Sequence, residues 1–348
     1  MGIIKLPEKS LKYFEEHQQE IFKSGSLAEG PWNDKVASWA REYTGALKAL
    51  AFNSNGSGLY TILRLLKRYK SKKTIFLQSN TMYGVKTIAN ASGLNLVGFV
   101  DCNLKYLMPT VNQVEEFIGT LDKPEEAVFM ITHIGGWINP DIQEIAELCS
   151  DKGVSLVEDC AHSLGSRIDG KHSGLFGDAG VYSLYATKAV PAGEGGILVT
   201  NNEDLYEMSK RFIMYDRFEQ EIDIGINLRM SELNALLSYA VIKETDNIIK
   251  DKYDIASKYI DACNSKNISY ITPNDSVHYS NLYKFILIEE HEDPDEKFKK
   301  LKTRTSPVYD YHLGSDPSEI ARRHICLPIW FKQDSSMTKE VLSEISSC

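Results

Sequence analysis

The sequence of 348 residues lacks the cysteine pattern of a disulfide-rich or zinc-binding protein. Its six cysteines are scattered without a Cys-x-x-Cys pair, and its eight histidines show no metal-ligand spacing. We therefore expect neither a disulfide framework nor a metal site. This cysteine usage is typical of a protein in a reducing cytoplasm.

Long hydrophobic runs and an excess of positive charge are absent as well. No apolar stretch is long enough to span a bilayer, and the first residues, Met-Gly-Ile-Ile-Lys-Leu, do not form the hydrophobic block of a signal peptide. The formal net charge of −9 at pH 7 argues against a general nucleic-acid binder. We expect a cytoplasmic protein that binds neither membranes nor nucleic acid.

What the sequence does contain is a regular alternation of short apolar runs and amphipathic stretches. The amphipathic stretches include 59–69 and 85–91, which we expect to be helices. The alternation predicts an α/β fold with a mostly parallel sheet and helices on both faces. The runs expected to form strands are 47–52, 74–77, 96–100, 127–132 and 154–157.

Later segments modify this parallel pattern. The runs 181–186 and 197–200 are joined by a connection too short for a crossover helix, so the second run is expected to be antiparallel. A long helical pattern begins near Ser231 and continues beyond Tyr253. We expect a large domain over 1–245, with an N-terminal helical arm over 1–30, and a smaller α+β C-terminal domain over 246–348.

One expected helix has a marked start. It follows the run 127–132, with Asn139 as its N-cap, Pro140 at its first position and Gly153 beyond its end. These residue preferences predict a helix between Pro140 and Gly153.

Polar residues follow several of the expected strands, where ligands bind in open α/β sheets. Gly56 and Ser57 follow the first strand, His133 follows "AVFMIT", Asp159 follows "VSLVE" and Lys188 follows "VYSLYA". Their positions predict a shared pocket.

The turn "NSNGSGL" would present backbone N–H groups at a helix start, which suits a phosphate. It lacks the third glycine of a dinucleotide-binding fingerprint, and no acidic residue stands near Gln78 to bind a ribose. The signal is weak for NAD. An ordinary strand-to-helix turn remains an alternative to a phosphate site.

Asp159 would be costly to bury unless a cation or hydrogen-bond donors meet it. Asp159 and His162 could form a structural carboxylate–imidazole hydrogen bond or belong to a hydrolase relay. A relay needs a nucleophilic serine, and no Gly-x-Ser-x-Gly is present. Asp159 is therefore expected to meet another cationic group.

Lys188 lies in "SLYATKAVPAGEGGILVT", between apolar runs and before a glycine cluster. Taken alone, it could be a loop lysine. Together with Asp159 and the Gly56–Ser57 turn, it suggests an imine-forming lysine whose pKa is lowered by burial. The ligand that needs such a lysine, a carboxylate and a phosphate cradle is pyridoxal 5'-phosphate.

The segments "SLYATK", "AGEGGILVT", "VEDCAHSLGS", "NSNGSGL" and "NLRMSELNA" resemble, in order and spacing, the DegT/StrS family of sugar-nucleotide aminotransferases. The similarity runs from about residue 30 to "HICLPIW" near residue 330. It implies fold type I of the pyridoxal-phosphate enzymes, with a mixed, mostly parallel sheet in the large domain.

The resemblance also implies roles for single residues. Lys188 matches the lysine that holds the cofactor and carries the proton, Asp159 the partner of the pyridine nitrogen, and His162 the side chain against the ring. The expected phosphate ligands are Gly56, Ser57, Ser183 and, from a neighbouring subunit, Asn227. A homodimer with shared active sites follows from the role of Asn227.

The sequence departs from the family at two places. Met82 stands where the family usually has an aromatic residue on the cofactor ring; Met82 or the adjacent Tyr83 could cover the ring, or both could be packing residues. The segment containing Tyr311, His312 and Arg322 only loosely matches the family's substrate-contacting segment. Those three side chains could contact substrate or lie on the surface.

The resemblance implies transfer of an amino group, with glutamate as donor, to a keto sugar linked to a nucleoside diphosphate. The product would be an amino sugar for a surface polysaccharide such as lipopolysaccharide O-antigen, or for a glycosylated metabolite. Relatives with histidine in place of Lys188 are dehydratases, so the lysine favours transamination. A non-transaminating pyridoxal enzyme, a cofactor-binding regulator and a NAD-dependent sugar oxidoreductase are the alternatives.

Overall fold

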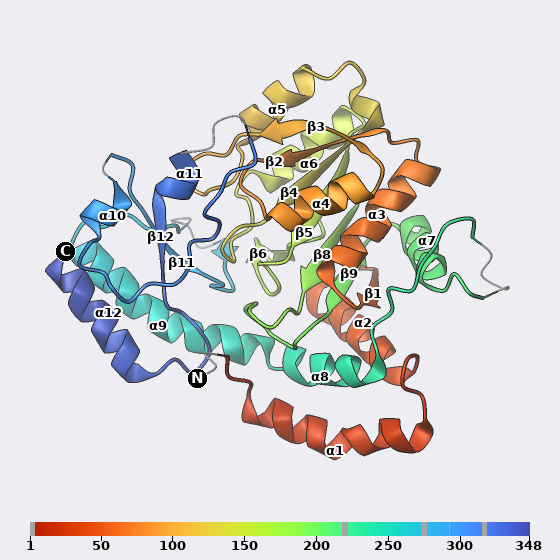
Figure 1. The fold of residues 1–348 in the computed structure, drawn as a ribbon, viewed down its shortest axis with the longest axis horizontal. Helices are drawn as coiled ribbons and strands as arrows, with labels where there is room; N and C mark the ends of the chain where they lie inside the picture. Colours follow the sequence, from red (N-terminus) through yellow and green to blue (C-terminus); the bar gives the residue numbers. More distant parts are fainter. Residues whose placement is uncertain (1–3, 218–221, 273–276, 292, 315–318) are drawn as a thin grey trace.

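A seven-stranded mixed sheet forms the centre of the larger part of the chain (Figure 1). The computed structural model describes residues 4–217, 222–272, 277–291, 293–314 and 319–348. In spatial order the strands are β1 (Lys48–Phe52), β9 (Gly196–Thr200), β8 (Ala179–Ser183), β5 (Ser155–Cys160), β4 (Ala127–Thr132), β2 (Thr74–Gln78) and β3 (Asn95–Val100).

The strands from β8 to β3 run parallel, whereas β9 runs antiparallel to both of its neighbours, β8 and β1. The connection between β8 and β9 contains no helix, so the chain returns directly beside the strand it has just left. The predicted mixed, mostly parallel sheet and the antiparallel β9 are confirmed.

Helices cover both faces of the sheet because successive side chains of a strand point to opposite faces. Val181 and Leu198 pack in one core, and their neighbours Tyr182 and Ile197 pack in another. The helices of the first core are α3 (Asn55–Tyr69), α4 (Tyr83–Ala91) and α7 (Glu203–Ile213). On the opposite face lie α2 (Pro31–Thr44), α5 (Val111–Gly119), α6 (Ile142–Asp151) and α8 (Glu232–Ile242).

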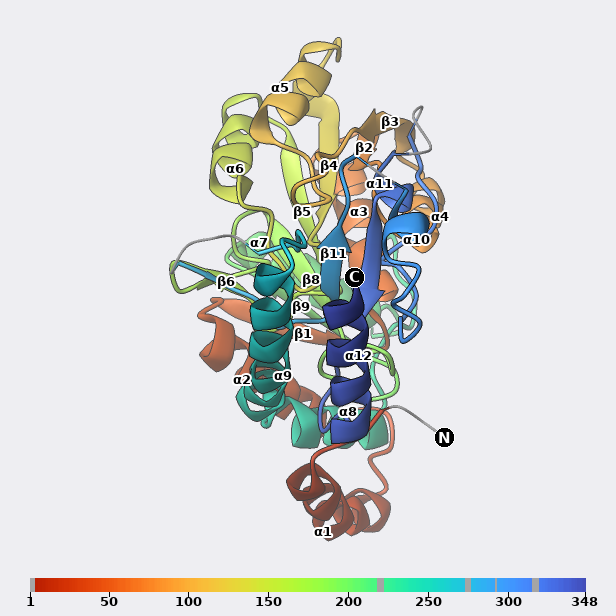
Figure 2. The same ribbon diagram turned by 90° about the vertical axis from the view of Figure 1, so that its left-hand side faces the viewer.

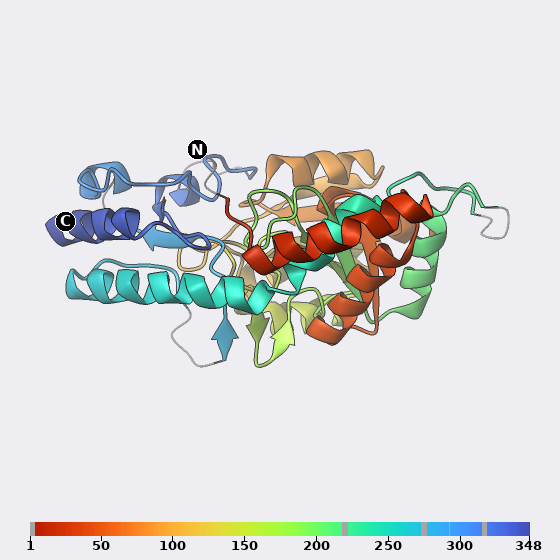
Figure 3. The ribbon, with the colours of Figure 1, turned by 90° about the horizontal axis from the view of Figure 1, so that it is seen from below.

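The N-terminal helix α1 (Glu8–Ser24) lies across α8 (Figure 3). A short 3-10 helix, η1 (Pro124–Glu126), precedes β4. No helix within the described ranges has both the length and the apolar character needed to cross a membrane.

The C-terminal part builds its own core around the helix α9 (Thr245–Ser265). Figure 2 shows α9 and the last helix, α12, running side by side, with the two-stranded sheet β11–β12 next to them. The elements of this part are β11 (Phe285–Ile288), α10 (Pro294–Lys297), α11 (Glu319–Arg322), β12 (His324–Leu327) and α12 (Ser335–Ser347). A three-stranded sheet formed by β10 (His278–Tyr279), β6 (Arg167–Ile168) and β7 (Lys171–His172) joins this part to the larger one.

The helix α9 passes from one core to the other. Ile248, in its first turn, packs in the core around α2 and α8, whereas Ile255 and Tyr259 pack in the C-terminal core. The expected domain limit at residue 245/246 thus coincides with the start of α9, and we retain it as a proposal.

Two details of the predicted helices are wrong. Asn139 is not an N-cap: α6 starts at Ile142, with Asp141 as its N-cap. The Asn139 side chain instead accepts a hydrogen bond from the Asp141 N–H (2.8 Å) and donates one to the Pro109 carbonyl (2.7 Å), which forms a turn ahead of the helix.

The long pattern from Ser231 is also interrupted. Ser231 does cap α8, but this helix ends at Ile242 and α9 begins at Thr245. No glycine or proline marks the break, since Lys243 and Glu244 separate the two helices. Hydrophobic periodicity alone therefore could not locate it.

Candidate active site

Lys188 lies on a loop that continues the ladder between β8 and β9. The Leu184 N–H donates to the Gly195 carbonyl, and the Ala186 N–H donates to the Gly193 carbonyl, each at 2.9 Å. Gly193 has a φ of 89°, a backbone conformation that favours glycine. The glycine cluster beyond Lys188 thus closes the loop and holds the lysine at the end of a buried strand.

The Lys188 ammonium is half-buried, and its Nζ lies 5.2 Å from the centre of the Tyr283 ring. Burial lowers the pKa of Lys188 to about 8; Asp159 opposes this shift, and the positive charge of Lys284 adds to it. A substantial fraction of this side chain is therefore a neutral amine near pH 8, as a nucleophile or base requires.

Asp159, in β5, is 2% exposed and meets neutral donors. Its Oδ1 accepts hydrogen bonds from the Asn55 side chain and the Ala161 N–H, both at 3.1 Å. Burial raises the pKa of Asp159, while these donors and the charge of Lys188 lower it. The hydrogen-bond donors to Asp159 Oδ1 are thus neutral, and one of them, the Asn55 amide, was not predicted. The predicted cation, Lys188, acts on Asp159 through its charge, and a direct contact between them remains a prediction.

His162 is buried beside aromatic rings of the C-terminal part. Its ring centre lies 4.4 Å from that of Tyr283 and 5.9 Å from that of Tyr309. Among the described residues its Nδ1 has no hydrogen-bond partner and no bond joins it to Asp159, which removes the carboxylate–imidazole pair considered above. Burial and the nearby charges of Lys188 and Lys284 hold the pKa of His162 well below its ordinary value, so the ring is neutral.

The turn after β1 forms the N-terminus of α3, as expected. Ser54 caps the helix by accepting a hydrogen bond from the Ser57 N–H at 3.1 Å. A side chain at Gly196 of β9 would meet the Ser54 carbonyl at 2.3 Å, so this glycine allows the strand and the helix start to approach closely. The first N–H groups of α3, including that of Gly56, have no partner within the helix and can bind an anion.

Ser183 borders this helix start. It pairs in register with Gly196, and its Oγ accepts a hydrogen bond from the Tyr185 N–H at 3.2 Å. The Asn55 amide bridges the same region, because it donates to Asp159 and to the Val181 carbonyl (2.7 Å). Lys188, Asp159, Ser183 and the Gly56–Ser57 turn therefore border one region of the fold.

Other predicted residues are not enclosed by this chain. Met82 is 43% exposed and Tyr83 is 59% exposed. Asn227 is exposed too, and its Oδ1 accepts a hydrogen bond from the Arg229 N–H at 3.3 Å. The ring-covering role of Met82 or Tyr83, and the role of Asn227 in a neighbouring subunit, remain predictions.

The three residues of the segment that only loosely matches the family lie in different surroundings. The Tyr311 hydroxyl accepts a hydrogen bond from the Tyr83 N–H at 2.6 Å, so it lies at the start of α4. His312 accepts a hydrogen bond from the Gly314 N–H at 3.2 Å. Arg322 lines a separate pocket with Arg304.

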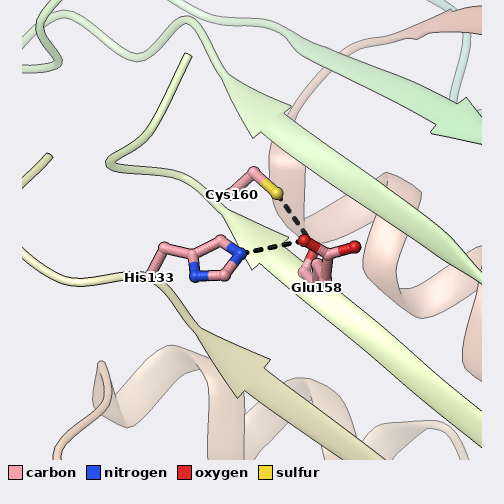
Figure 4. A group of neighbouring side chains, drawn as sticks. All are labelled: His133, Glu158 and Cys160. Atoms are coloured by element: carbon pink, nitrogen blue, oxygen red, sulfur yellow. Dashed lines mark hydrogen bonds and ion pairs between the residues drawn. The ribbon is translucent and has the colours of Figure 1, made fainter. Parts of the chain in front are cut away.

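His133, which we expected in the shared pocket, belongs to a buried cluster with Glu158 and Cys160 (Figure 4). The His133 Nε2 lies 2.9 Å from Glu158 Oε2. Glu158 also accepts backbone N–H bonds from Gly174 (2.7 Å), Phe176 (2.7 Å) and Gly177 (2.8 Å). Each carboxylate oxygen thus receives two interactions, which leaves no lone pair directed at a metal ion; the cluster is structural.

Replacement of Glu158 by glutamine is expected to lower the free energy of unfolding by about 2–4 kcal/mol. The amide NH₂ would face N–H donors that the carboxylate now satisfies. Equilibrium urea unfolding measures the loss, with the exposed Glu144→Gln as the matched control. Equal stability of the Glu158 variant and the control would contradict the structural role.

Comparison with known proteins agrees with this geometry. The sequence profile of the DegT/DnrJ/EryC1/StrS aminotransferase family matches residues 10–345. The chain belongs to this family. The match extends beyond residues 30–330, over which the sequence motifs carry the resemblance.

Relatives within the family include a GDP-perosamine synthase of Vibrio cholerae, 28% identical over 66% of this chain and 62% of that protein. A UDP-4-amino-4,6-dideoxy-N-acetyl-beta-L-altrosamine transaminase of Helicobacter pylori is 26% identical over 69% of this chain and 64% of that protein. The matches thus span less than two thirds of either relative. A family member from Brucella abortus has a similar fold, with a TM-score of 0.86, 19% identity and coverage of 100% of this chain and 99% of that one. Fold type I is confirmed.

Enzymes of this family use pyridoxal phosphate, which confirms the cofactor expected from the sequence. The residues of this chain fit it. His162 has a buried Nδ1 without a partner among the described residues, Asp159 is a buried carboxylate, and the α3 N-terminus offers N–H groups to a phosphate. Lys188 supplies the amine.

Proposed function

We propose that this chain is a pyridoxal-phosphate aminotransferase that moves an amino group, from glutamate, to the keto group of a nucleoside-diphosphate-linked sugar. The observation that carries the proposal is the position of Lys188, a half-buried amine held at the end of the β8–β9 ladder, where burial lowers its pKa to about 8. The names of the Vibrio and Helicobacter relatives support a sugar nucleotide as acceptor.

Bound pyridoxal phosphate supplies an electron sink for the pair released when a C–H bond of the substrate breaks. Lys188 takes up that proton as a base and returns it as an acid. Asp159 holds a proton on the pyridine nitrogen by its negative charge. The N–H groups at the start of α3 and the Ser183 hydroxyl bind the phosphate, and His162 positions the ring.

Covalent uptake of pyridoxal phosphate by the apoenzyme is expected to depend on the titration of Lys188. The neutral amine is the reactive form, so the rate should rise about tenfold per pH unit below pH 8 and level off above it. Stopped-flow absorbance between about pH 6 and pH 10 measures this profile. A rate that still rises steeply above about pH 9 would show that Lys188 has the pKa of an ordinary lysine and would contradict this prediction.

The complete reaction provides the test of function. Holoenzyme is mixed with glutamate and a panel of keto-sugar nucleotides, and the amino sugar is detected by mass spectrometry. Glutamate should reduce the violet absorption of the bound cofactor, and a keto-sugar nucleotide should restore it. A dehydratase would instead consume sugar without glutamate, and a NAD-dependent oxidoreductase would lack the violet band.

The proposal includes a cytoplasmic homodimer that makes an amino sugar for O-antigen or another surface polysaccharide. Five of the six cysteines are buried and all six are free thiols, which suits a reducing compartment. In this dimer a second subunit would bring its own Asn227 to the site, and the exposure of Asn227 on its own chain leaves it accessible for that contact.

A further inference from the structure

A cavity of about 330 Å³ lies beside Lys188, at the junction between the Lys188 loop and the C-terminal part. Its walls come from sequence-distant elements: Lys252 of α9, Lys284 before β11, Ser306, and Trp330 after β12. The volume is at the lower end of the range for small-molecule pockets. It suits a ligand of amino-acid size rather than a whole sugar nucleotide.

The charge of this cavity is opposite to that of the protein. Four lysines line it, Lys5, Lys188, Lys252 and Lys284, and no aspartate or glutamate is among the described residues of its wall. The chain as a whole has a net charge of −9. A cavity with this concentration of positive charge selects an anion.

Two of the four lysines are already engaged, one in an ion pair and one as the reactive amine. The Lys5 Nζ donates to the Lys332 carbonyl and to Asp334, each at 2.8 Å. Lys188 is the reactive amine. Lys252 and Lys284 remain as ammonium groups available to a ligand.

Lys252 is 2% exposed, yet its Nζ makes a single long hydrogen bond among the described residues, 3.4 Å to the Asn281 carbonyl. Lys72 shows how this chain satisfies a structural lysine: it is also buried, but donates to the carbonyls of Glu125 and Gly153, both at 2.7 Å. A buried ammonium group with unused donors is costly unless a ligand meets it.

The other groups around Lys252 do not neutralise it. Burial and the charge of Lys284 lower the pKa of Lys252 to about 7, and Asp251 on the same helix only partly opposes this. Asp251 itself accepts a hydrogen bond from the Lys332 N–H at 2.6 Å. An incoming carboxylate would favour the charged form of Lys252.

Lys284 lies on the other side of the same cavity. Its Nζ donates to the Ser306 carbonyl at 3.0 Å and approaches Ser306 Oγ at 3.4 Å, which orients the ammonium group and leaves one of its three protons. Lys188, Lys252 and Lys284 line the same cavity, and the positive charge of Lys284 lowers the pKa of the other two.

We propose that Lys252 and Lys284 form the subsite that binds the two carboxylates of the amino donor. Two ammonium groups match the two carboxylates of such a donor, and Lys188, the reactive amine, lines the same cavity. This inference rests on the proposed function and gives it a donor specificity that comes from the chain's own side chains.

The test measures binding of glutarate, a dicarboxylate that cannot transfer an amino group, to the holoenzyme by calorimetry. Lys252→Met and Lys284→Met are each expected to weaken glutarate binding on the order of tenfold. In the reaction with glutamate alone, the glutamate concentration that gives half of the maximal rate should rise by the same factor. The maximal rate at which the cofactor absorption decreases should change little. Lys250→Met removes an exposed lysine from the same helix and should leave both values unchanged.

The outcomes separate the alternatives. Unchanged glutarate affinity in both variants, or an equal loss in Lys250→Met, would overturn the subsite. Weaker binding of a nucleoside diphosphate with normal glutarate binding would also overturn it, by assigning these lysines to the sugar nucleotide. If glutarate binds through the two lysines but no amino acid changes the absorption, the subsite stands and the proposed function fails.

Folding of the variants does not limit the experiment. Methionine has a volume similar to that of lysine and removes a buried charge, so Lys252→Met should be as stable as the wild type or more stable. If it does not fold, Lys284→Met, at a half-buried position, decides the question alone.

Discussion

Replacement of Lys188 by alanine is expected to reduce amino transfer by at least about 10³-fold. Proton transfer by a positioned side chain contributes about 10²–10⁴-fold, and here the same amine also holds the cofactor. The β8–β9 loop holds Lys188 at the strand end by its ladder, so alanine leaves no amine at this position. Product formation measured by mass spectrometry provides the rate.

The fold of this variant should remain intact. Lys188 is half-buried with a lowered pKa, so its charged form is disfavoured by its surroundings and its loss should not reduce the melting temperature. Lys152→Ala, at an exposed position after α6, is the matched control and should have wild-type activity. Wild-type turnover in Lys188→Ala would refute the assignment of this lysine.

Replacement of Asp159 by asparagine is expected to slow the reaction by about 10²–10³-fold, which is typical for loss of one preorganised electrostatic group. The amide is similar in shape and can still accept hydrogen bonds from Asn55 and the Ala161 N–H. It carries no charge, so it cannot favour a proton on the pyridine nitrogen. Initial rates at saturating donor and acceptor measure the effect.

The stability of Asp159→Asn distinguishes a functional carboxylate from a structural one. Because the folded-state pKa of Asp159 is raised, the carboxylate costs stability that is absent at low pH and appears as the pH rises through that pKa. The variant should therefore be as stable at neutral pH as the wild type or more stable, as is usual at active sites. Marked destabilisation relative to the exposed Asp151→Asn would indicate a structural role instead.

The sequence predicted those parts of the site that follow single strands. Asp159 in β5 and Lys188 after β8 stand out because each is a charged side chain at the end of an apolar run, where a buried strand reaches the edge of the sheet. Gly56 and Ser57 stand out because glycine and serine mark a turn that opens a helix. These signals come from residues that are neighbours in the sequence. The order of those residues determines at which strand end each side chain lies.

The parts that depend on long-range packing were not predicted. Tyr283 and Tyr309 contact His162 from more than a hundred residues away in the sequence, and nothing local distinguishes them from other core tyrosines. Lys252 reads as one more solvated lysine in a helical pattern, whereas the structure buries it. Asn55 belongs to a turn that indicates only a helix start, and nothing in the sequence indicates that its amide donates to Asp159.

Because α9 packs in both cores, a tilt about its first turn would move its two ends by different distances. Its pivot is the turn around Ile248, held in the core of the sheet, and its far end is near Cys263. At about 1.5 Å per residue, a tilt of about 5° would carry the far end about 2 Å but would move Lys252 by only about 0.5 Å. Such a tilt would therefore shift the far end of the C-terminal core while the ammonium group of Lys252 stays nearly fixed relative to Lys188.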